Sequence, residues 1–115
     1  MLNEYKIKIV MDSAQIIEVI NRINMYLTFV QEKNPVQECE VYRHKILSKI
    51  GQKLSSKVYS VEEKKFIKLN VNAVEQMALV ACFIRTQISP QLQGIFILLD
   101  SKYPAKVIRN EKYLH

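Results

Sequence analysis

Glycine, proline and tryptophan are scarce in this chain of 115 residues, which contains two glycines, three prolines and no tryptophan. So few turn-forming residues leave little room for elaborate loops, and we expect long elements joined by short connections. With 49% hydrophobic and 24% charged residues, the composition is that of an ordinary globular protein. A chain of this length predicts one domain, spanning residues 1–115, around a single hydrophobic core.

Long apolar stretches and a secretion signal are also missing. The longest uninterrupted apolar run, Met77 to Ile84, is far too short to cross a membrane. The opening stretch, MLNEYKIKIV, alternates charged with apolar side chains and lacks the continuous hydrophobic segment of a signal peptide. Cys39 and Cys82 stand within apolar helical patterns without partners at metal-ligand spacing, which is typical of reduced core residues. We therefore expect a cytoplasmic protein with no membrane partner.

The patterns that usually carry catalysis are absent as well: a glycine-rich phosphate loop, a Cys/His metal set and a serine nucleophile elbow. His44 is the only histidine before the terminal residue. Cys39 precedes it by five residues. This spacing puts the two side chains about 140° apart around a helix and excludes a nucleophile–base pair on one face. The sequence thus predicts a non-catalytic protein with no cofactor, no metal and no small-molecule substrate.

Positive charge is concentrated in one stretch. The net charge is +6, and residues 43–68 alone contain eight basic and two acidic side chains. We therefore expect any anionic partner to bind along this stretch. Isoleucine and lysine are unusually common, with fourteen isoleucines and thirteen lysines against four arginines. This bias indicates an AT-rich coding genome and favours a bacterium or a bacterial mobile element.

A strand followed by a helix appears twice, at positions sixty residues apart: Tyr5 to Ile23 aligns with Lys65 to Phe83 without a gap. In each unit apolar side chains alternate with lysine or asparagine, which predicts a half-buried strand. Capping boxes are predicted at the starts of both helices by two pairs with the same spacing, Asp12 with Gln15 and Asn72 with Glu75. The alignment is compatible with an internal duplication and equally with two ordinary strand–helix units.

Helical periodicity follows both strands. The first helix is predicted to end near Glu32 and to carry one apolar stripe, formed by Ile16, Ile20, Ile23, Leu27 and Val30. The helix after the second strand is predicted to end near Gln87, with its richest apolar side at Met77, Val80, Ala81 and Ile84.

Two further helices are expected. Asn34, Pro35 and Gln37 predict the start of a helix that ends near Ser55. Gly51 inside it costs about 1 kcal/mol relative to alanine and indicates a close backbone contact. The apolar side of this helix is formed by Cys39, Tyr42, Ile46, Ile50 and Leu54. A short strand is expected at Val58 to Val61.

The segment that begins at Pro90 favours a helix, because Leu92, Ile95, Phe96 and Leu99 are at helical spacing. A strand pair across residues 95–109 is the alternative. Together the elements predict an α+β domain, two short strands packed against three or four helices in the order β-α-α-β-α-α. A two-stranded sheet is marginal alone, so helices must cover one face. Its free edges invite pairing with a second subunit, and we expect a homodimer.

The second helix carries the sharpest candidate site, a predicted nucleic-acid-binding face formed by Arg43, Lys45, Lys49, Lys53, Lys57 and Tyr59. Four residues turn a helix by about 400°, so a lysine at every fourth position drifts by only about 40° per step. Like charges at this spacing repel by about 0.2–0.5 kcal/mol per pair unless an anion offsets them. The alternative is a solvated face, because Glu38 and Glu40 suit the helix's positive N-terminus and the lysines its negative C-terminus.

Two weaker surfaces complete the picture. A second basic cluster with aromatic residues lies near the C-terminus, at Lys102, Tyr103, Lys106, Arg109, Lys112 and Tyr113. Met25 and Phe29 broaden the apolar stripe of the first helix and are candidates for core packing or for an interface. We therefore predict a small accessory or regulatory protein that acts by binding another macromolecule. A protein partner, including a second copy of the chain, is slightly favoured over nucleic acid.

Overall fold

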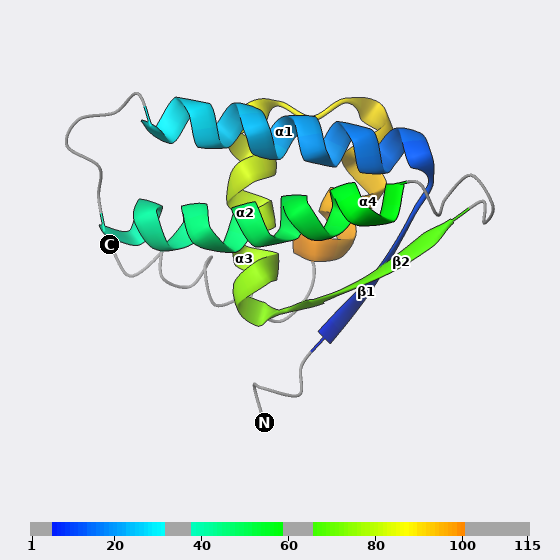
Figure 1. Ribbon diagram of the computed structural model, residues 1–115. Helices are drawn as coiled ribbons and strands as arrows, with labels where there is room; N and C mark the ends of the chain where they lie inside the picture. The colour runs from blue at the N-terminus through cyan, green and yellow to red at the C-terminus, as the bar shows by residue number, and fades with distance from the viewer. Residues whose placement is uncertain (1–5, 32–37, 59–65, 101–115) are drawn as a thin grey trace.

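The computed structural model describes residues 6–31, 38–58 and 66–100 and contains two strands and four helices in these parts of the chain (Figure 1). Their order is β-α-α-β-α-α, so the predicted α+β architecture is confirmed. The elements are β1 (Lys6–Met11), α1 (Ser13–Gln31), α2 (Glu38–Lys57), β2 (Ile67–Asn72), α3 (Ala73–Thr86) and α4 (Pro90–Asp100).

The two strands pair antiparallel, with a register that runs from Lys6 opposite Asn72 to Met11 opposite Ile67. Alternate residues of each strand are buried, so one face of the sheet contributes to the core and the other face is open to solvent. The buried face consists of Ile7, Ile9, Met11, Ile67, Leu69 and Val71. The predicted alternation of both strands is therefore confirmed.

The register of the sheet matches the sixty-residue repeat. Ile9 lies opposite Leu69, and these are the two positions that the repeat superimposes. Ile7 lies opposite Val71, and Met11 lies opposite Ile67. The offset of sixty residues superimposes Ile7 on Ile67 and Met11 on Val71, so the repeat converts each of these two pairs into the other. An approximate twofold axis between Ile9 and Leu69 thus relates the two strands. An internal duplication and two ordinary strand–helix units are both compatible with this register.

The capping boxes predicted at Asp12 and at Asn72 are present, while Asn34 and Gln37, which predicted a third, lie outside the described residues. The Asp12 amide donates to Gln15 Oε1 at 3.0 Å, and the Gln15 amide donates to Asp12 Oδ1 at 2.8 Å. At α3 the corresponding bonds between Asn72 and Glu75 measure 2.9 and 2.8 Å. Each box satisfies backbone donors that the first turn of a helix leaves without partners, and fixes where the strand ends and the helix begins.

The helices bury their apolar sides against one core. The side chains that α1, α2 and α4 bury most completely are Ile16, Val19, Ile23, Tyr26, Leu47, Ile50, Leu54, Leu92 and Leu99. The buried stripe of α1 consists of Ile16, Val19, Ile23 and Tyr26. It differs from the predicted stripe, because Ile20 and Leu27 are only half-buried at its margin. Phe83 of α3 and Phe96 of α4 pack with their ring centroids 6.4 Å apart. The helix predicted at Pro90 is confirmed by α4, and residues 101–109 lie outside the described parts.

Three other predictions are wrong. Met77 and Ile84 of α3 are 38% and 58% exposed, because the neighbouring helices contact the other side of α3, where Gln76, Leu79, Val80 and Phe83 are buried. Tyr42, expected on the apolar side of α2, is 67% exposed. Val58 directly follows α2 in a tighter helical turn and not in a strand, while residues 59–61 lie outside the described parts.

The close backbone contact expected at Gly51 is not a tight one. A Cβ atom there would meet Ile23 Cγ2 at 3.6 Å, an ordinary van der Waals distance, and a Cβ atom at Gly94 would meet nothing within 4 Å. Both glycines lie inside helices, where alanine restricts the unfolded chain and favours the helix.

We therefore expect Gly51→Ala and Gly94→Ala each to raise the free energy of unfolding by about 0.5–1 kcal/mol. Urea unfolding followed by circular dichroism measures the change, and Gly94→Ala serves as the control because its surroundings are empty. A loss of stability in Gly51→Ala alone would show that α1 and α2 approach more closely at this point than the structure shows.

Candidate functional site

The lysine stripe of α2, Lys45, Lys49, Lys53 and Lys57, follows one side of the helix over about 18 Å. The first three side chains are exposed, and Lys57 is half-buried because the stripe drifts toward the core side of the helix. Among the residues that the structure describes, none of these lysines forms an ion pair. Their charge is therefore available to a partner.

A groove of about 420 Å³ runs beside the N-terminal half of this stripe. It is lined by Tyr42, Lys45, Ile46 and Lys49 of α2 and by Asn72, Val74 and Glu75 at the start of α3. One bank is cationic and carries the exposed ring of Tyr42. On the other bank, Asn72 and Glu75 hold each other in the capping box. A groove of this size can take a nucleotide or a short peptide segment.

Two of the predicted site residues are not part of this arrangement. Arg43 lies about 160° around the helix from Lys45, and its Nη1 donates to the Tyr26 hydroxyl of α1 at 3.3 Å. Because Tyr26 is buried, Arg43 connects α2 to α1. Tyr59 lies outside the described residues, as does the basic cluster of the C-terminal segment.

The open face of the sheet holds cationic residues that the sequence argument placed outward but did not weigh as a site. Lys6, Lys8 and Lys68 are exposed there. The antiparallel register brings Lys68 diagonally next to Lys8 across the strands. The signal in the sequence for this surface was the alternation of lysine or asparagine with apolar residues in the two strands. It could not show that the two sets of lysines share one surface, because that depends on how the strands pair.

The charged side chains that the structure places as exposed are all cationic: Lys6, Lys8, Lys45, Lys49, Lys53, Lys68 and Arg85. The carboxylates placed in the same parts are buried or half-buried, and the side chain of Glu38 lies outside the description. Asp12 and Glu75 cap helices, and Glu18 and Glu40 are buried. Asp100 is half-buried at the end of α4. Exposed positive charge therefore dominates the part of the surface that the structure describes.

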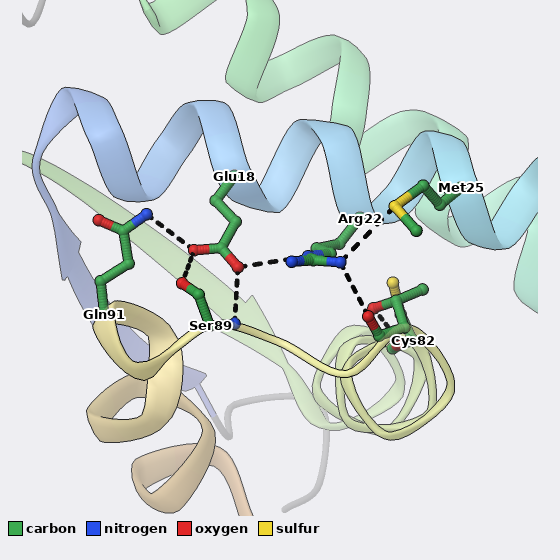
Figure 2. A network of polar contacts seen from close by, with 7 residues as sticks. Glu18, Arg22, Met25, Cys82, Ser89 and Gln91 are labelled. Carbon is green, nitrogen blue, oxygen red and sulfur yellow. Dashed lines mark hydrogen bonds and ion pairs between the residues drawn. The ribbon is translucent and has the colours of Figure 1, made fainter.

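A polar network around Glu18 attaches the start of α4 to α1 (Figure 2). The Glu18 carboxylate accepts hydrogen bonds from the Ser89 amide at 2.9 Å, from the Ser89 hydroxyl, and from the Gln91 side chain at 2.7 Å. Arg22 Nε lies 3.2 Å from the same carboxylate, and Arg22 Nη1 donates to the Thr86 carbonyl at 2.9 Å. The network therefore joins α1 to the last turn of α3, to the connection that follows and to the first turn of α4.

The charge of Glu18 is strongly stabilised. Burial raises the pKa of its carboxyl, but the hydrogen bonds donated by Ser89, Gln91 and Arg22 outweigh burial and lower the pKa from 4.5 to about 2. Every interaction of this carboxylate is with the fold itself, and only 9% of the Glu18 surface is exposed. The network is therefore a structural anchor, and it supplies no reactive group.

The thiol of Cys82 lies close to this network but is not activated by it. Burial raises the pKa of Cys82 to about 12, although Thr86 and Arg22 nearby act in the opposite direction. The thiol is fully buried and stays protonated, as the sequence predicted for a core cysteine. In the described parts of the chain, no three His, Cys, Asp or Glu side chains are grouped so as to hold a metal ion.

None of the helices described has both the length and the apolar character needed to cross a membrane. Comparison of the chain with protein-family models, with curated proteins and with solved structures finds no match. Function must therefore be inferred from the surface described above.

Acid is expected to weaken the attachment of α4 to α1. The pKa of Glu18 in the folded chain lies below its ordinary 4.5, so its carboxylate stabilises the fold fully above pH 4.5, and this stabilisation is lost as the pH falls toward 2. In Glu18→Gln the NH2 group of the glutamine, itself a donor, faces a donor of Ser89. We therefore expect the free energy of unfolding at neutral pH to fall by about 1–3 kcal/mol. Urea unfolding at a series of pH values measures both effects.

Glu75→Gln is the matched control for this experiment. Glutamine can accept the capping hydrogen bond that Glu75 accepts, and Glu18 stays in place. The control should keep the loss of stability between pH 4.5 and 2. If Glu18→Gln keeps that loss as well, the anchor assigned to Glu18 does not hold.

Proposed function

We propose that this protein is a non-catalytic nucleic-acid-binding protein of the cytoplasm, and that the lysine stripe of α2 contacts the phosphates. The observation that carries the proposal is that the charged side chains which the structure places at the surface as exposed are all positive, with the densest row on α2. Phosphate contacts made by lysine supply most of the affinity in binding that does not depend on base sequence.

The helix dipole does not account for this row. The dipole acts within the last turn of a helix, and in α2 only Lys57 lies there. Lys45 and Lys49 stand in the middle of the helix, where each repels the next lysine by about 0.2–0.5 kcal/mol. A phosphate backbone along the stripe would replace these repulsions by attraction.

The stripe predicts a steep dependence of affinity on salt. Four lysine–phosphate contacts give a slope of about −3.6 for the logarithm of affinity against the logarithm of salt concentration on a duplex. Between about 50 and 200 mM salt this corresponds to a loss of roughly a hundredfold. In Lys49→Gln/Lys53→Gln the slope should become shallower by about 1.8. Fluorescence anisotropy with labelled duplexes measures it.

Lys49→Arg/Lys53→Arg is the matched control, since it keeps both charges and the helical propensity at the same positions. It should bind with the slope of the unaltered chain. Absence of binding to any nucleic acid at the lower salt concentration would overturn the proposal. Equal slopes in the glutamine and arginine variants would remove α2 from the interface.

A second candidate function, self-association, is favoured by the exposed side of α3. This side carries Val74, Met77, Ala81 and Ile84, of which Val74 and Ile84 are at least half exposed, and the exposed Arg85 lies at its C-terminal end. The small side chain of Ala81 lies between the larger ones and would let a second helix approach closely. Two copies of the chain related by a twofold axis would bring the same side chains together, as in most homodimers.

If α3 forms a dimer contact, Ile84→Glu should convert a dimer into a monomer, because it places a charge in the contact. Ile97→Glu on α4 is the matched control, since Ile97 and Ile84 are exposed to a similar degree, 62% and 58%. Light scattering coupled to size-exclusion chromatography measures the mass of each variant. A monomeric unaltered chain at high concentration excludes this function, and a dimer that only Ile97→Glu disrupts moves the contact to α4.

A further inference from the structure

The open face of the sheet has a composition that neither the fold nor the lysine stripe of α2 explains. Its three cross-strand pairs are Lys6 with Asn72, Lys8 with Asn70, and Val10 with Lys68. All six side chains are exposed, and none is acidic. Phe66, directly before β2, is 57% exposed. Figure 1 shows the helices gathered on one side of the strand pair.

The lysines of this face are close neighbours. Residues diagonal across an antiparallel pair lie about 7–8 Å apart, and long side chains reach across this distance. Lys8 and Lys68 have this relation, and Lys6 is the next residue on the same side of β1 as Lys8. Like charges so arranged repel. A face selected only for solubility would intersperse acidic residues among them.

We propose that the open face of the sheet binds single-stranded nucleic acid. The three ammonium groups are complementary to successive phosphates, and the ring of Phe66 offers a stacking surface for an unpaired base. The side-chain amides of Asn70 and Asn72 can donate to the Watson–Crick edges of bases, which a single strand leaves free and a duplex occupies with base pairs. This inference rests on the proposed function only in taking nucleic acid as the partner. The residues that carry it are different.

The two surfaces meet at Asn72. This residue is opposite Lys6 on the open face and also lines the groove beside Lys45, Lys49 and Tyr42. Its Oδ1 accepts the capping hydrogen bond from the Glu75 amide, which leaves the amide hydrogens of its side chain to donate. A single strand on the sheet can therefore continue into the groove. A duplex cannot bind in this way, because its bases are stacked on one another and none is free to stack on Phe66.

The test compares a single strand of about 20 nucleotides with a duplex of the same length, both titrated onto the full chain at low salt. Phe66→Ala should weaken single-strand binding by about five- to 150-fold, the loss expected for one stacked base, and leave duplex binding unchanged. Phe66→Tyr keeps the ring and should bind as the unaltered chain does. Lys8→Gln/Lys68→Gln should make the salt slope for the single strand shallower by about 1.4.

Each other outcome decides against the inference in a recognisable way. If Phe66→Ala and Lys8→Gln/Lys68→Gln bind the single strand as before while Lys49→Gln/Lys53→Gln weakens both ligands, the sheet is not a site and the role of α2 stands. If Lys8→Gln/Lys68→Gln weakens both ligands equally and Phe66→Ala has no effect, the face is a general polyanion surface. If the unaltered chain binds neither ligand, both proposals fail together. Circular dichroism of each variant confirms that the fold is retained.

Discussion

The antiparallel pairing of β1 with β2 about Ile9 and Leu69 is the constraint on which the other features depend. It puts Ile7, Ile9, Met11, Ile67, Leu69 and Val71 on one face, and every lysine of the two strands, together with Val10, on the other. A sheet of two strands cannot stand alone, and here the helices cover only its apolar face. The pairing that forms one side of the core therefore also creates the open cationic face. A shift of one residue in one strand would turn the lysines of that strand toward the core and its apolar side chains toward solvent.

The placement of the carboxylates follows from the helices that this sheet supports. Asp12 and Glu75 are held in capping boxes directly after the strands, and Glu18 is held by the connection into α4. Each of these three carboxylates is thereby held by backbone or side-chain donors of the chain. None of the exposed lysines in the described parts forms an ion pair. The described surface therefore carries mostly positive exposed charge, which composition alone does not reveal.

Local features were predictable from the sequence because a few neighbouring residues determine them. Both capping boxes, the alternation of the strands and the helix after Pro90 are of this kind. The errors concern which side of a helix faces the core. Met77 and Ile84 are as apolar as Leu79 and Phe83, and only the positions of the neighbouring helices leave the first pair exposed. Arg43 and the open face of the sheet depend likewise on contacts between distant segments, so only the folded chain shows which lysines belong together.

The recurrence of the same element order in the two halves of the fold also bears on the origin of the lysine stripe. Each unit consists of a strand, a capped helix and a second helix, and α2 and α4 are the second helices. Lysine recurs along α2, whereas α4 contains no lysine or arginine between Pro90 and Asp100. Both helices nevertheless bury leucine and isoleucine in the same core. A helix in this position can therefore pack without a basic face, so the requirements of the scaffold alone do not explain the row of positive charge on α2. Contact with an anionic partner is the explanation that we propose for it.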